Sequence, residues 1–423
     1  MLKFLLKGIF RDRHRWFFPI LIVMFSVAIM IFFSAFISGF QLSYIRQSAR
    51  FSNGHAKVVS RAYAEVLDMK HYDLALMDIE EEFEKWKMRY PQLEWFERIN
   101  FGALLDVPDE FGETKTQVDV IGMAVDLDED SAEIDRLQLT QALRKGHLPQ
   151  ARGQILLSDL VAEKIEADLG DSITLMGSTM FGVMTLRNFE VVGTVEFGIP
   201  ALDRGAVLAE LEDVREMLDM QDAKSEIFCY LKDEEYDLKT VTQIANDFNS
   251  RYSDEEDEFS PLMLSLHDQG SLGSILSLYD HSQFWMSIGF IVIIGIVLWN
   301  MGLLNGIRRY SENGIRLAIG ESKGQVYASL LMEALIIGIA GCVLGIALGI
   351  LFCNSFNKVG MDLSLYNKST NMMSENVLYT VLNPRAIITG SLTGLFASIL
   401  GSALAGTAIY KRQISQLFKE LET

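Results

Sequence analysis

Residues 308–335 read RRYSENGIRLAIGESKGQVYASLLMEAL, a basic and turn-rich stretch between two long apolar segments. Asn313, Gly314, Gly320 and Gly324 favour turns, because asparagine and glycine tolerate backbone conformations that most residues avoid. A polar, turn-rich stretch in this place is typical of a loop that joins two membrane-spanning helices. The number and direction of the membrane crossings therefore decide the fold.

Four stretches lack charge for long enough to cross a bilayer, which requires about 20 apolar residues in a helix. They are Phe17–Phe40, Phe284–Leu304, Ala334–Phe352 and Ala386–Tyr410. A buried helix of a soluble protein rarely stays apolar on all sides over such a length. The first stretch exceeds the apolar core of a signal peptide, about 7–15 residues, so we interpret it as a retained anchor.

Basic residues set the expected orientation, because cytoplasmic segments next to membrane spans carry an excess of lysine and arginine. Residues 1–16, the segment from 308 to 325 and the C-terminal tail are all rich in these residues. We therefore expect both termini in the cytoplasm and the large region outside. The predicted parts are a cytoplasmic amphipathic helix (1–16), transmembrane helices (17–40, 284–306, 326–353 and 386–410), a large periplasmic domain (41–283), a cytoplasmic coupling segment (307–325), a short periplasmic loop (354–385) and a cytoplasmic tail (411–423).

The large region is strongly acidic. Residues 41–283 carry 22 Lys and Arg against 48 Asp and Glu, a net charge of −26. Such a surface argues against nucleic acid and against direct binding of anionic lipid head groups by this region. Solubility alone is also a sufficient reason for the charge.

Helix and strand patterns alternate along the same region, which predicts an α+β domain. Helical spacing runs from Asp73 to Pro91, and amphipathic helices are expected near 211–218 and 238–248. Strand-like runs occupy 116–125, 171–178 and 185–197, and the acidic run 253–259 predicts a solvated loop. The fold class is therefore four transmembrane helices with a large α+β domain inserted between the first two.

Catalytic and metal-binding motifs are missing from the sequence. It contains no G-x-x-x-x-G-K-[ST] phosphate loop, no H-E-x-x-H and no C-x-x-C. The six histidines are scattered, and Cys229, Cys342 and Cys353 show neither disulfide nor metal spacing. We predict a non-catalytic chain that binds no metal or cofactor itself.

Two further groups of residues are candidate sites. Glu333, at the start of the third span, is a functional candidate because ionisable groups are costly within a bilayer, although a place at the membrane interface would also explain it. Met180, Phe181 and Met184, in GSTMFGVMTL, could contact an acyl chain of a substrate, or simply form a hairpin tip.

The opening stretch and its surroundings resemble the FtsX-like permease domain of ABC transporters. That domain has a glutamate, Gly-Ile-Arg, a small residue with glycine, a basic position, a glutamate and a glycine-rich span. The matching positions are Glu312, Gly314, Ile315, Arg316, Ala318, Gly320, Lys323, Glu333 and the run GIAGCVLGIALG from 338 to 349. Residues 53–63, 152–176 and 189–218 resemble the MacB-like periplasmic core domain of the same family.

The resemblance implies a permease of the macrolide-exporter and lipoprotein-releasing type in the bacterial inner membrane. Such a permease works with two copies of a separate ATPase, which binds ATP and Mg, and with a second permease, identical or paralogous. Its coupling segment docks on the ATPase and passes motion to the periplasmic domains. The expected coupling residues are Arg308, Arg309, Glu312, Gly314, Ile315, Arg316, Gly320 and Lys323.

Small residues in the third span allow a close helix approach, either within the chain or between two permeases. They are Gly338, Gly341, Gly345 and Gly349. Membrane lipids, a lipoprotein or other amphiphilic substrate, and a periplasmic carrier or outer-membrane component are further candidate partners. Nucleic acid is not expected.

The substrate class stays open at this point. Lipoprotein-releasing permeases often show Gln-Gly where this chain has Glu333-Ala334, which favours the macrolide-exporter side, whereas the length and the large outer domain favour lipoprotein release. Alternatives are an exporter of macrolides, other toxic compounds or peptides, a mechanotransmitter that activates a cell-wall hydrolase, and a sensor or adhesion protein without an ATPase.

Overall fold

A computed structural model describes residues 13–69, 71–108, 114–128, 130–232, 236–270, 272–308, 315–362 and 377–411. The chain divides into two compact units. The helical unit comprises Met1–Leu42, Ser277–Met361 and Val377–Thr423, and the sheet domain comprises Ser43–Leu276 and Asp362–Asn376. The predicted amphipathic helix 1–16 lies largely outside the described residues, since the first described helix begins at Arg13.

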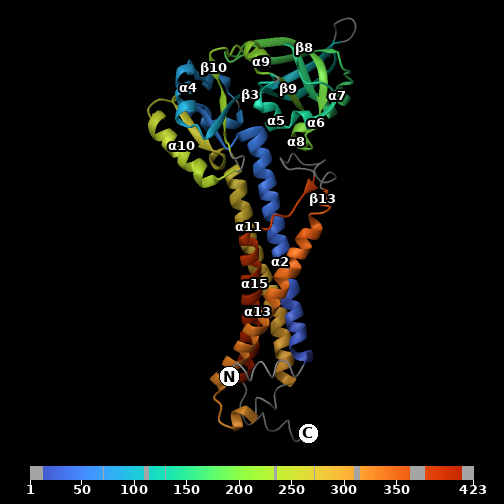
Figure 1. Ribbon diagram of the computed structural model, residues 1–423, viewed down its shortest axis with the longest axis vertical. Helices are drawn as coiled ribbons and strands as arrows, with labels where there is room; N and C mark the ends of the chain where they lie inside the picture. Colours follow the sequence, from blue (N-terminus) through green and yellow to red (C-terminus); the bar gives the residue numbers. More distant parts are fainter. Residues whose placement is uncertain are drawn as a thin grey trace. The chain divides into compact units, whose positions relative to one another are not determined.

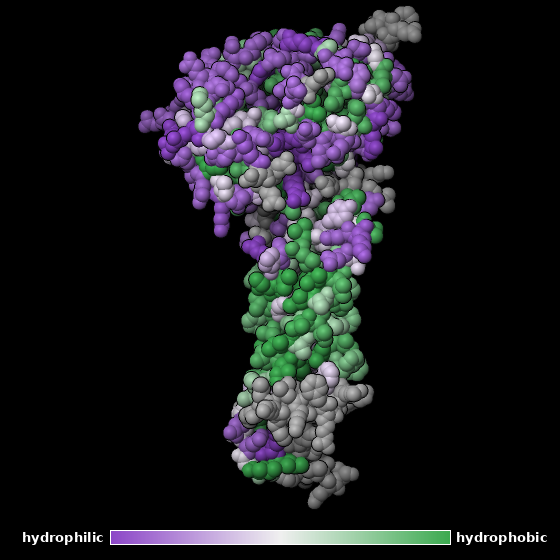
Figure 2. All heavy atoms as spheres, in the orientation of Figure 1, coloured by the Kyte–Doolittle hydropathy of each residue, from purple (hydrophilic) through white to green (hydrophobic). Residues whose placement is uncertain are grey.

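Four long helices carry the apolar stretches (Figure 1): α2 (Arg13–Ser48), α11 (Leu272–Arg308), α13 (Lys323–Phe356) and α15 (Pro384–Lys411). Each is long and apolar enough to cross a membrane, so the four apolar stretches of the sequence do form four long helices. Figure 2 shows hydrophobic side chains over these helices and mostly hydrophilic ones over the sheet domain. In the short segment between α13 and α15, Met361–Asp362 (β13) pairs with Val377–Leu378 (β14).

Glycines let α13 pack closely against α2. A Cβ atom on Gly341 or Gly345 would lie 2.7 Å from the Cβ of Val23 or Val27, respectively. One on Gly349 would lie 3.1 Å from the Cβ of Ile31. Because the contact positions on both helices increase together in steps of four, the two helices run parallel, as the first and third spans of one chain must.

The fourth glycine of the run faces a different helix. A Cβ on Gly338 would lie 3.4 Å from Ser398 of α15. Nearby, the Ser398 hydroxyl donates to the Ala334 carbonyl at 3.1 Å. All four glycines therefore contact helices of the same chain, which is the intramolecular alternative of the two that the sequence allowed.

The sheet domain is built on one ten-stranded sheet, mostly antiparallel, with parallel pairs β4–β9 and β6–β8. Helices and strands alternate along the chain, as the sequence predicts. The two parallel strand pairs give the domain an α/β character in addition to the expected α+β one. The strands, in spatial order, are β12 (Pro261–Ser265), β1 (Ala56–Ser60), β11 (Glu226–Leu231), β3 (Leu93–Pro108), β4 (Thr114–Val125), β9 (Ala206–Glu210), β6 (Gln154–Ser158), β8 (Met184–Val195) and β5 (Leu143–Gly146).

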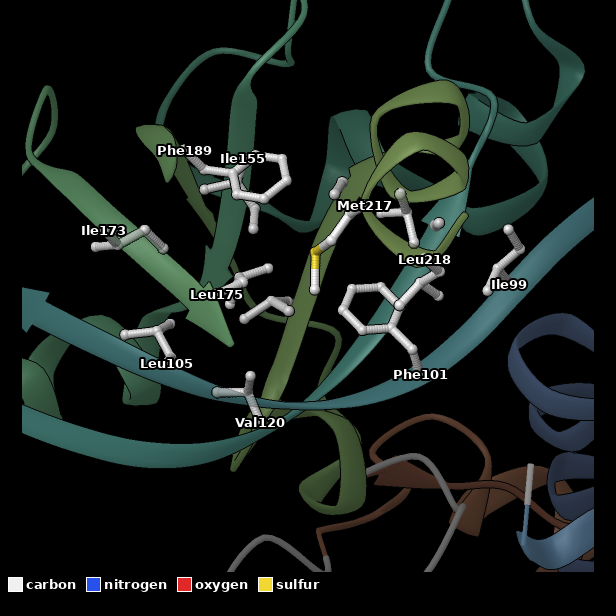
Figure 3. Close-up of a cluster of buried hydrophobic side chains, with 14 of the residues drawn as sticks. Ile99, Phe101, Leu105, Val120, Ile155, Ile173, Leu175, Phe189, Met217 and Leu218 are labelled. Atoms are coloured by element: carbon white, nitrogen blue, oxygen red, sulfur yellow. The ribbon is translucent and has the colours of Figure 1, made fainter. Parts of the chain in front are cut away.

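Six of these strands close into a ring, because β7 (Ser172–Ser178) pairs with both β3 and β8. The ring β3-β4-β9-β6-β8-β7 encloses an apolar core that includes Phe101, Leu175 and Phe189. Figure 3 shows these side chains converging with Met217 and Leu218, which come from α9 (Leu211–Leu218). Helix α9 covers the core together with α7 (Asp159–Ile165).

The long strand β3 joins this ring to a second layer. Its first half, Leu93–Arg98, pairs with β11, and its second half pairs with β4 and β7. The β12-β1-β11 layer is covered by α4 (Glu80–Arg89) and α10 (Leu238–Tyr252), which bury Trp86 and Phe248. One continuous strand therefore ties the two cores together.

The helix predicted from Asp73 is shorter than expected, since α4 begins only at Glu80. Residues 72–74 form a 3-10 turn, and Leu76–Met77 forms β2, which pairs with β10 (Ala223–Lys224). Asp78 adopts a φ of +52°, a left-handed conformation that no continuous right-handed helix can include. The helical spacing of apolar residues predicted too early a start because it included Leu76, which is buried on a strand and not on a helix face.

The packing of α13 on α2 predicts a site-specific steric cost. Gly345→Leu would drive a side chain into Val27 and should lower the unfolding free energy by about 1–3 kcal/mol. Gly289 on α11 meets no atom within 4 Å, so Gly289→Leu is the matched control. Thermal unfolding of the purified full-length chain in one detergent measures both, and equal melting temperatures would contradict the close contact.

Candidate functional site

The described part of the coupling segment begins at Ile315, where residues 315–318 form one helical turn. The Ile319 amide donates to the Ile315 carbonyl at 3.0 Å, and Gly320 ends the turn with a φ of +104°. Glycine enters this left-handed region without a steric cost. Arg309, Glu312 and Gly314 lie outside the described residues, while Arg308 is the last residue of α11.

A capping box starts α13 directly after this turn. The Ser322 hydroxyl accepts the Gln325 amide at 3.3 Å, and the Gln325 side chain accepts the Ser322 amide at 2.9 Å. This arrangement satisfies amide donors that a helix N-terminus otherwise leaves open. Residues 320–324, GESKG, match the letters of a hydrolase nucleophile elbow, but that motif joins a strand to a helix and Ser322 is a helix cap after a helical turn.

Arg316 ties the turn to α13. One of its terminal nitrogens, Nη1, donates to the hydroxyl of Ser329 at 3.1 Å, and its Nε lies 3.5 Å from a Glu321 carboxylate oxygen. Ser329 is buried on the second turn of α13. These contacts link the turn to the first two turns of α13, although pairs this exposed add little stability.

The surface of the turn is apolar. Ile315 and Ile319 are 60% and 81% exposed, and their i, i+4 spacing places them on one face. Sequence reasoning included Ile315 but missed Ile319, which the same helical spacing would have found. An exposed isoleucine pair on a braced turn is a surface suited to a protein partner.

Glu333 lies half-buried on α13, ten residues after Lys323 and about 15 Å along the helix. The uncharged stretch begins at its neighbour Ala334, so Glu333 stands at the boundary of that stretch. This position fits the interface alternative as well as a functional role.

The candidate substrate residues occupy the hairpin that links β7 and β8, and the structure separates them. Met180 is buried in the ring core, and its amide donates to the Leu218 carbonyl at 2.8 Å. Phe181 and Met184 are each 68% exposed. Val183 and Leu186, which sequence reasoning missed, are 62% and 59% exposed, so the hairpin carries four exposed apolar side chains. The sequence already contained a sign of this apolar surface, because no residue from 180 to 184 has a polar side chain.

A second candidate site lies where α2 enters the sheet domain. Residues Ala49–Asn53 form a π-helical turn, and Gly54 ends it with a φ of +64°. The turn carbonyls accept from three strands: Tyr230 Oη donates to Ala49 O at 2.9 Å, Arg98 Nη1 to Arg50 O at 2.6 Å, and Lys57 Nζ to Ser52 O at 2.8 Å. We call this set of contacts the joint.

Buried ion pairs position the two cations of the joint. Arg98 donates two hydrogen bonds of 2.7 Å to Glu133, and Lys57 Nζ lies 2.9 Å from Glu226. All four side chains are at most 4% exposed. Removing one member of such a buried pair costs about 3–5 kcal/mol, because it leaves the other charge uncompensated. The cations also face the carbonyl end of a helix, where positive charge is favourable.

His55 lies beside the joint in its neutral form. Its Nδ1 accepts the Leu231 amide at 3.0 Å, and its ring packs against Tyr230 and Tyr236 at centroid distances of 5.3 and 5.6 Å. Burial, aided by the positive charge of Arg136, lowers the pKa of His55 from 6.5 to about 4. Among the residues that the structure describes, no group of three His, Cys, Asp or Glu side chains could hold a metal.

A protein with four apolar helices and one large sheet domain between the first two belongs to the class of multi-span membrane proteins. Residues 17–246 match the MacB-like periplasmic core domain, and residues 284–414 match the FtsX-like permease C-terminal domain. The first match alone covers more than half of the chain. The chain therefore belongs to the FtsX-like and MacB-like family of ABC-transporter permeases, which confirms the resemblance.

Curated relatives carry the name macrolide export ATP-binding/permease protein MacB. The protein from Campylobacter jejuni strain 81-176 is 28% identical over 131 residues, which are 31% of this chain and 18% of that protein. The Psychrobacter cryohalolentis protein is 29% identical over 93 residues, 22% and 14% of the two chains. The alignments thus span less than a fifth of these relatives.

The periplasmic region of MacB from Actinobacillus actinomycetemcomitans is a similar solved structure. It aligns with 52% of this chain and 92% of its own, at 11% identity and a TM-score of 0.34. A TM-score of this size does not bear on the fold.

Neutral His55 predicts a pH dependence of stability. The unfolded chain takes up the proton near pH 6.5 and the folded one only near 4, so stability is full above 6.5 and falls as the pH drops toward 4. At pH 5 the loss from this group is about 2 kcal/mol, from 1.36 kcal/mol per pKa unit.

His55→Asn keeps an acceptor for the Leu231 amide and removes the titration. Its unfolding free energy should therefore fall less than that of the wild type between pH 7 and pH 5, measured by denaturant titration. His71→Asn, at an exposed site, is the control and should keep the wild-type slope. An unchanged slope in His55→Asn would show that the buried ring does not titrate as inferred.

Proposed function

We propose that this chain is the permease subunit of an ABC transporter that moves a lipoprotein or another amphiphilic substrate at the periplasmic face of the bacterial inner membrane. Both termini and the coupling segment lie in the cytoplasm, and the sheet domain lies in the periplasm. A separate ATPase, present in two copies, binds ATP and Mg, and a second permease completes the complex. The observation that carries the proposal is the braced, apolar turn at the position of the family's coupling segment.

The proposed path of force starts at this turn. Ile315 and Ile319 bind the ATPase, and the contacts of Arg316 pass the movement of the ATPase to α13. The glycine contacts carry it to α2, which continues without a break to Ser48 and then enters the joint. Lys323 adds a second argument, since a cation at a helix N-terminus is unfavourable by about 0.3–1 kcal/mol. A carboxylate of the ATPase would compensate it.

The apolar hairpin tip supports an amphiphilic substrate or its carrier as the ligand of the sheet domain. Exposed Phe181 and Met184 can cover an acyl chain without a change in the core, because the buried Met180 anchors the loop. The second candidate is an exporter of macrolides or other toxic compounds, which the names of the curated relatives favour. The third candidate function is a mechanotransmitter that activates a cell-wall hydrolase, which would use the same path of force.

The ATPase partnership is tested by affinity purification of the tagged full-length chain from its native membranes. We expect a phosphate-loop ATPase to co-purify and its ATP hydrolysis to depend on the permease. Ile315→Ser with Ile319→Ser should weaken the association about tenfold or more, since each buried isoleucine contributes roughly 1.5–3 kcal/mol.

The matched control for this double variant is Ile388→Ser, an isoleucine that is 58% exposed on α15. It should leave both co-purification and ATP hydrolysis unchanged. Lys323→Glu should also reduce the ATPase stimulation, because it reverses the charge expected to pair with the ATPase. Full stimulation in the isoleucine double variant would exclude the turn as the coupling contact.

The substrate proposal is tested at the hairpin tip. Phe181→Ser with Met184→Ser should reduce the affinity for a fluorescent diacylated lipopeptide at least about tenfold, through lost apolar contact. Phe259→Ser with Met88→Ser, residues 50% and 74% exposed elsewhere on the sheet domain, is the control. If neither pair changes lipopeptide binding while a macrolide stimulates ATP hydrolysis, the exporter alternative replaces lipoprotein release.

A further inference from the structure

A groove lies between α11 and α15 at the end of the helical unit where α15 begins. It has a volume of about 430 Å³ and opens to the surface of the helices. Its lining mixes apolar and polar side chains. One wall consists of Gln283, Phe284, Ser287 and Ile291 of α11, and the other of Arg385, Thr389, Leu392, Thr393 and Phe396 of α15. Neither the coupling segment nor the hairpin tip contributes to it.

Helices α11 and α15 meet closely at one level beside the groove. A Cβ on Gly401 would lie 2.8 Å from the Cβ of Leu298 and 2.9 Å from the carbonyl oxygen of Gly295. The groove lies on the Arg385 side of this contact, where the lining residues Phe284 and Phe396 are 60% and 57% exposed.

The groove is as deep as one leaflet of a bilayer. Arg385 and Phe396 are eleven residues apart, which is about 16 Å along a helix at 1.5 Å per residue. Half of a hydrocarbon core about 30 Å thick is about 15 Å. Arg385 directly precedes the uncharged stretch 386–410, so its side chain stands at the level of the lipid head groups.

The chemistry of the lining changes along this depth. Arg385 is exposed at the first turn of α15, where a guanidinium and a helix N-terminus both favour an anion. Below it, the Thr393 hydroxyl donates to the Thr389 carbonyl at 2.8 Å, so this polar group is satisfied within the helix. On α11, Gln283 donates to the Ser34 hydroxyl and Ser287 to the Gln283 carbonyl, so these polar groups are also satisfied. Leu392 and Phe396, 50% and 57% exposed, supply apolar surface farther from Arg385.

We propose that this groove binds a glycerophospholipid of the leaflet next to the start of α15, with its phosphate at Arg385 and one acyl chain along Leu392 and Phe396. A transmembrane helix of a second copy fits less well. The guanidinium of Arg385 at one end of the groove favours an anionic phosphate, a group that a transmembrane helix of a second copy does not carry. The bound lipid would fill the space between α11 and α15 where their side chains do not meet, and this role does not depend on the proposed transport function.

Native mass spectrometry of the full-length chain in a mild detergent tests the site, with phosphatidylglycerol and a diacylglycerol of the same chains as probes. We expect tighter binding of phosphatidylglycerol. Arg385→Gln should weaken it about fivefold, the contribution of one basic residue at a membrane surface, and should leave diacylglycerol unchanged. Thr389→Trp, which fills the groove, should remove both, and Leu392→Trp serves the same purpose if that variant does not fold.

The matched controls lie near the same end of the helical unit but outside the groove. Lys358→Gln removes an exposed cation, and Ile388→Trp enlarges an exposed residue of α15, so both should bind phosphatidylglycerol as the wild type does. Excess inorganic phosphate should not displace the lipid.

Equal binding of the two probes by wild type and Arg385→Gln would overturn the proposal, because it indicates only nonspecific surrounding lipid. Displacement by inorganic phosphate alone would overturn the acyl-chain part. A dimer that Thr389→Trp dissociates, with no lipid retained by the wild type, would assign the groove to a second copy instead.

Discussion

The close approach of α13 to α2 is the contact on which the helical unit depends. Glycines at three successive i+4 positions meet Val23, Val27 and Ile31, so the two helices interlock along about 12 Å of their length. Apolar side chains gain little from association in lipid, and close packing of small residues replaces the hydrophobic effect there. The two helices therefore pack as one pair over this length.

The joint also holds two parts of the chain together, but it uses hydrogen bonds and buried charges instead of close apolar packing. In the π-helical turn the Ala49 carbonyl accepts the Gly54 amide at 2.9 Å and also the Tyr230 hydroxyl. Arg98 and Lys57, from two further strands, donate to the carbonyls of Arg50 and Ser52. A purely apolar contact would allow the turn to rotate about its axis at small cost. Directional hydrogen bonds from buried, paired cations fix the rotation as well as the position. The cost of burying these charges is offset by Glu133 and Glu226, so the joint is rigid as long as both pairs remain intact.

Sequence reasoning reached the spans and many strands because these features follow from local patterns. Charge-free stretches marked the four helices, and alternation placed β4, β7 and β8 within two residues of their observed bounds. The closure of the ring by β7 was invisible, since it pairs residues near 105 with residues near 175. The joint was equally hidden, because Arg98 and Glu133 read as two more charges in an acidic region and only the fold buries them together. Of the coupling residues, spacing identified Ile315 through the family motif, whereas the bracing role of Arg316 required the coordinates of Ser329.

The four helices are not equivalent in their packing. Within the chain, 44% of the most apolar segment of α2 is buried but only 17% of that of α11. Helix α15 is tied to α13 by Ser398 and by the Tyr327 hydroxyl, which donates to the Ala403 carbonyl at 3.3 Å. Helices α2, α13 and α15 therefore form one packed group, while α11 touches α15 closely at Gly295 and Gly401. Helix α11 also reaches α2, since Gln283 donates to the Ser34 hydroxyl and Ile294 and Leu298 share an apolar cluster with Val23 and Val27. Its low burial therefore reflects few close contacts along its length, because the contacts that it makes to both neighbours are local.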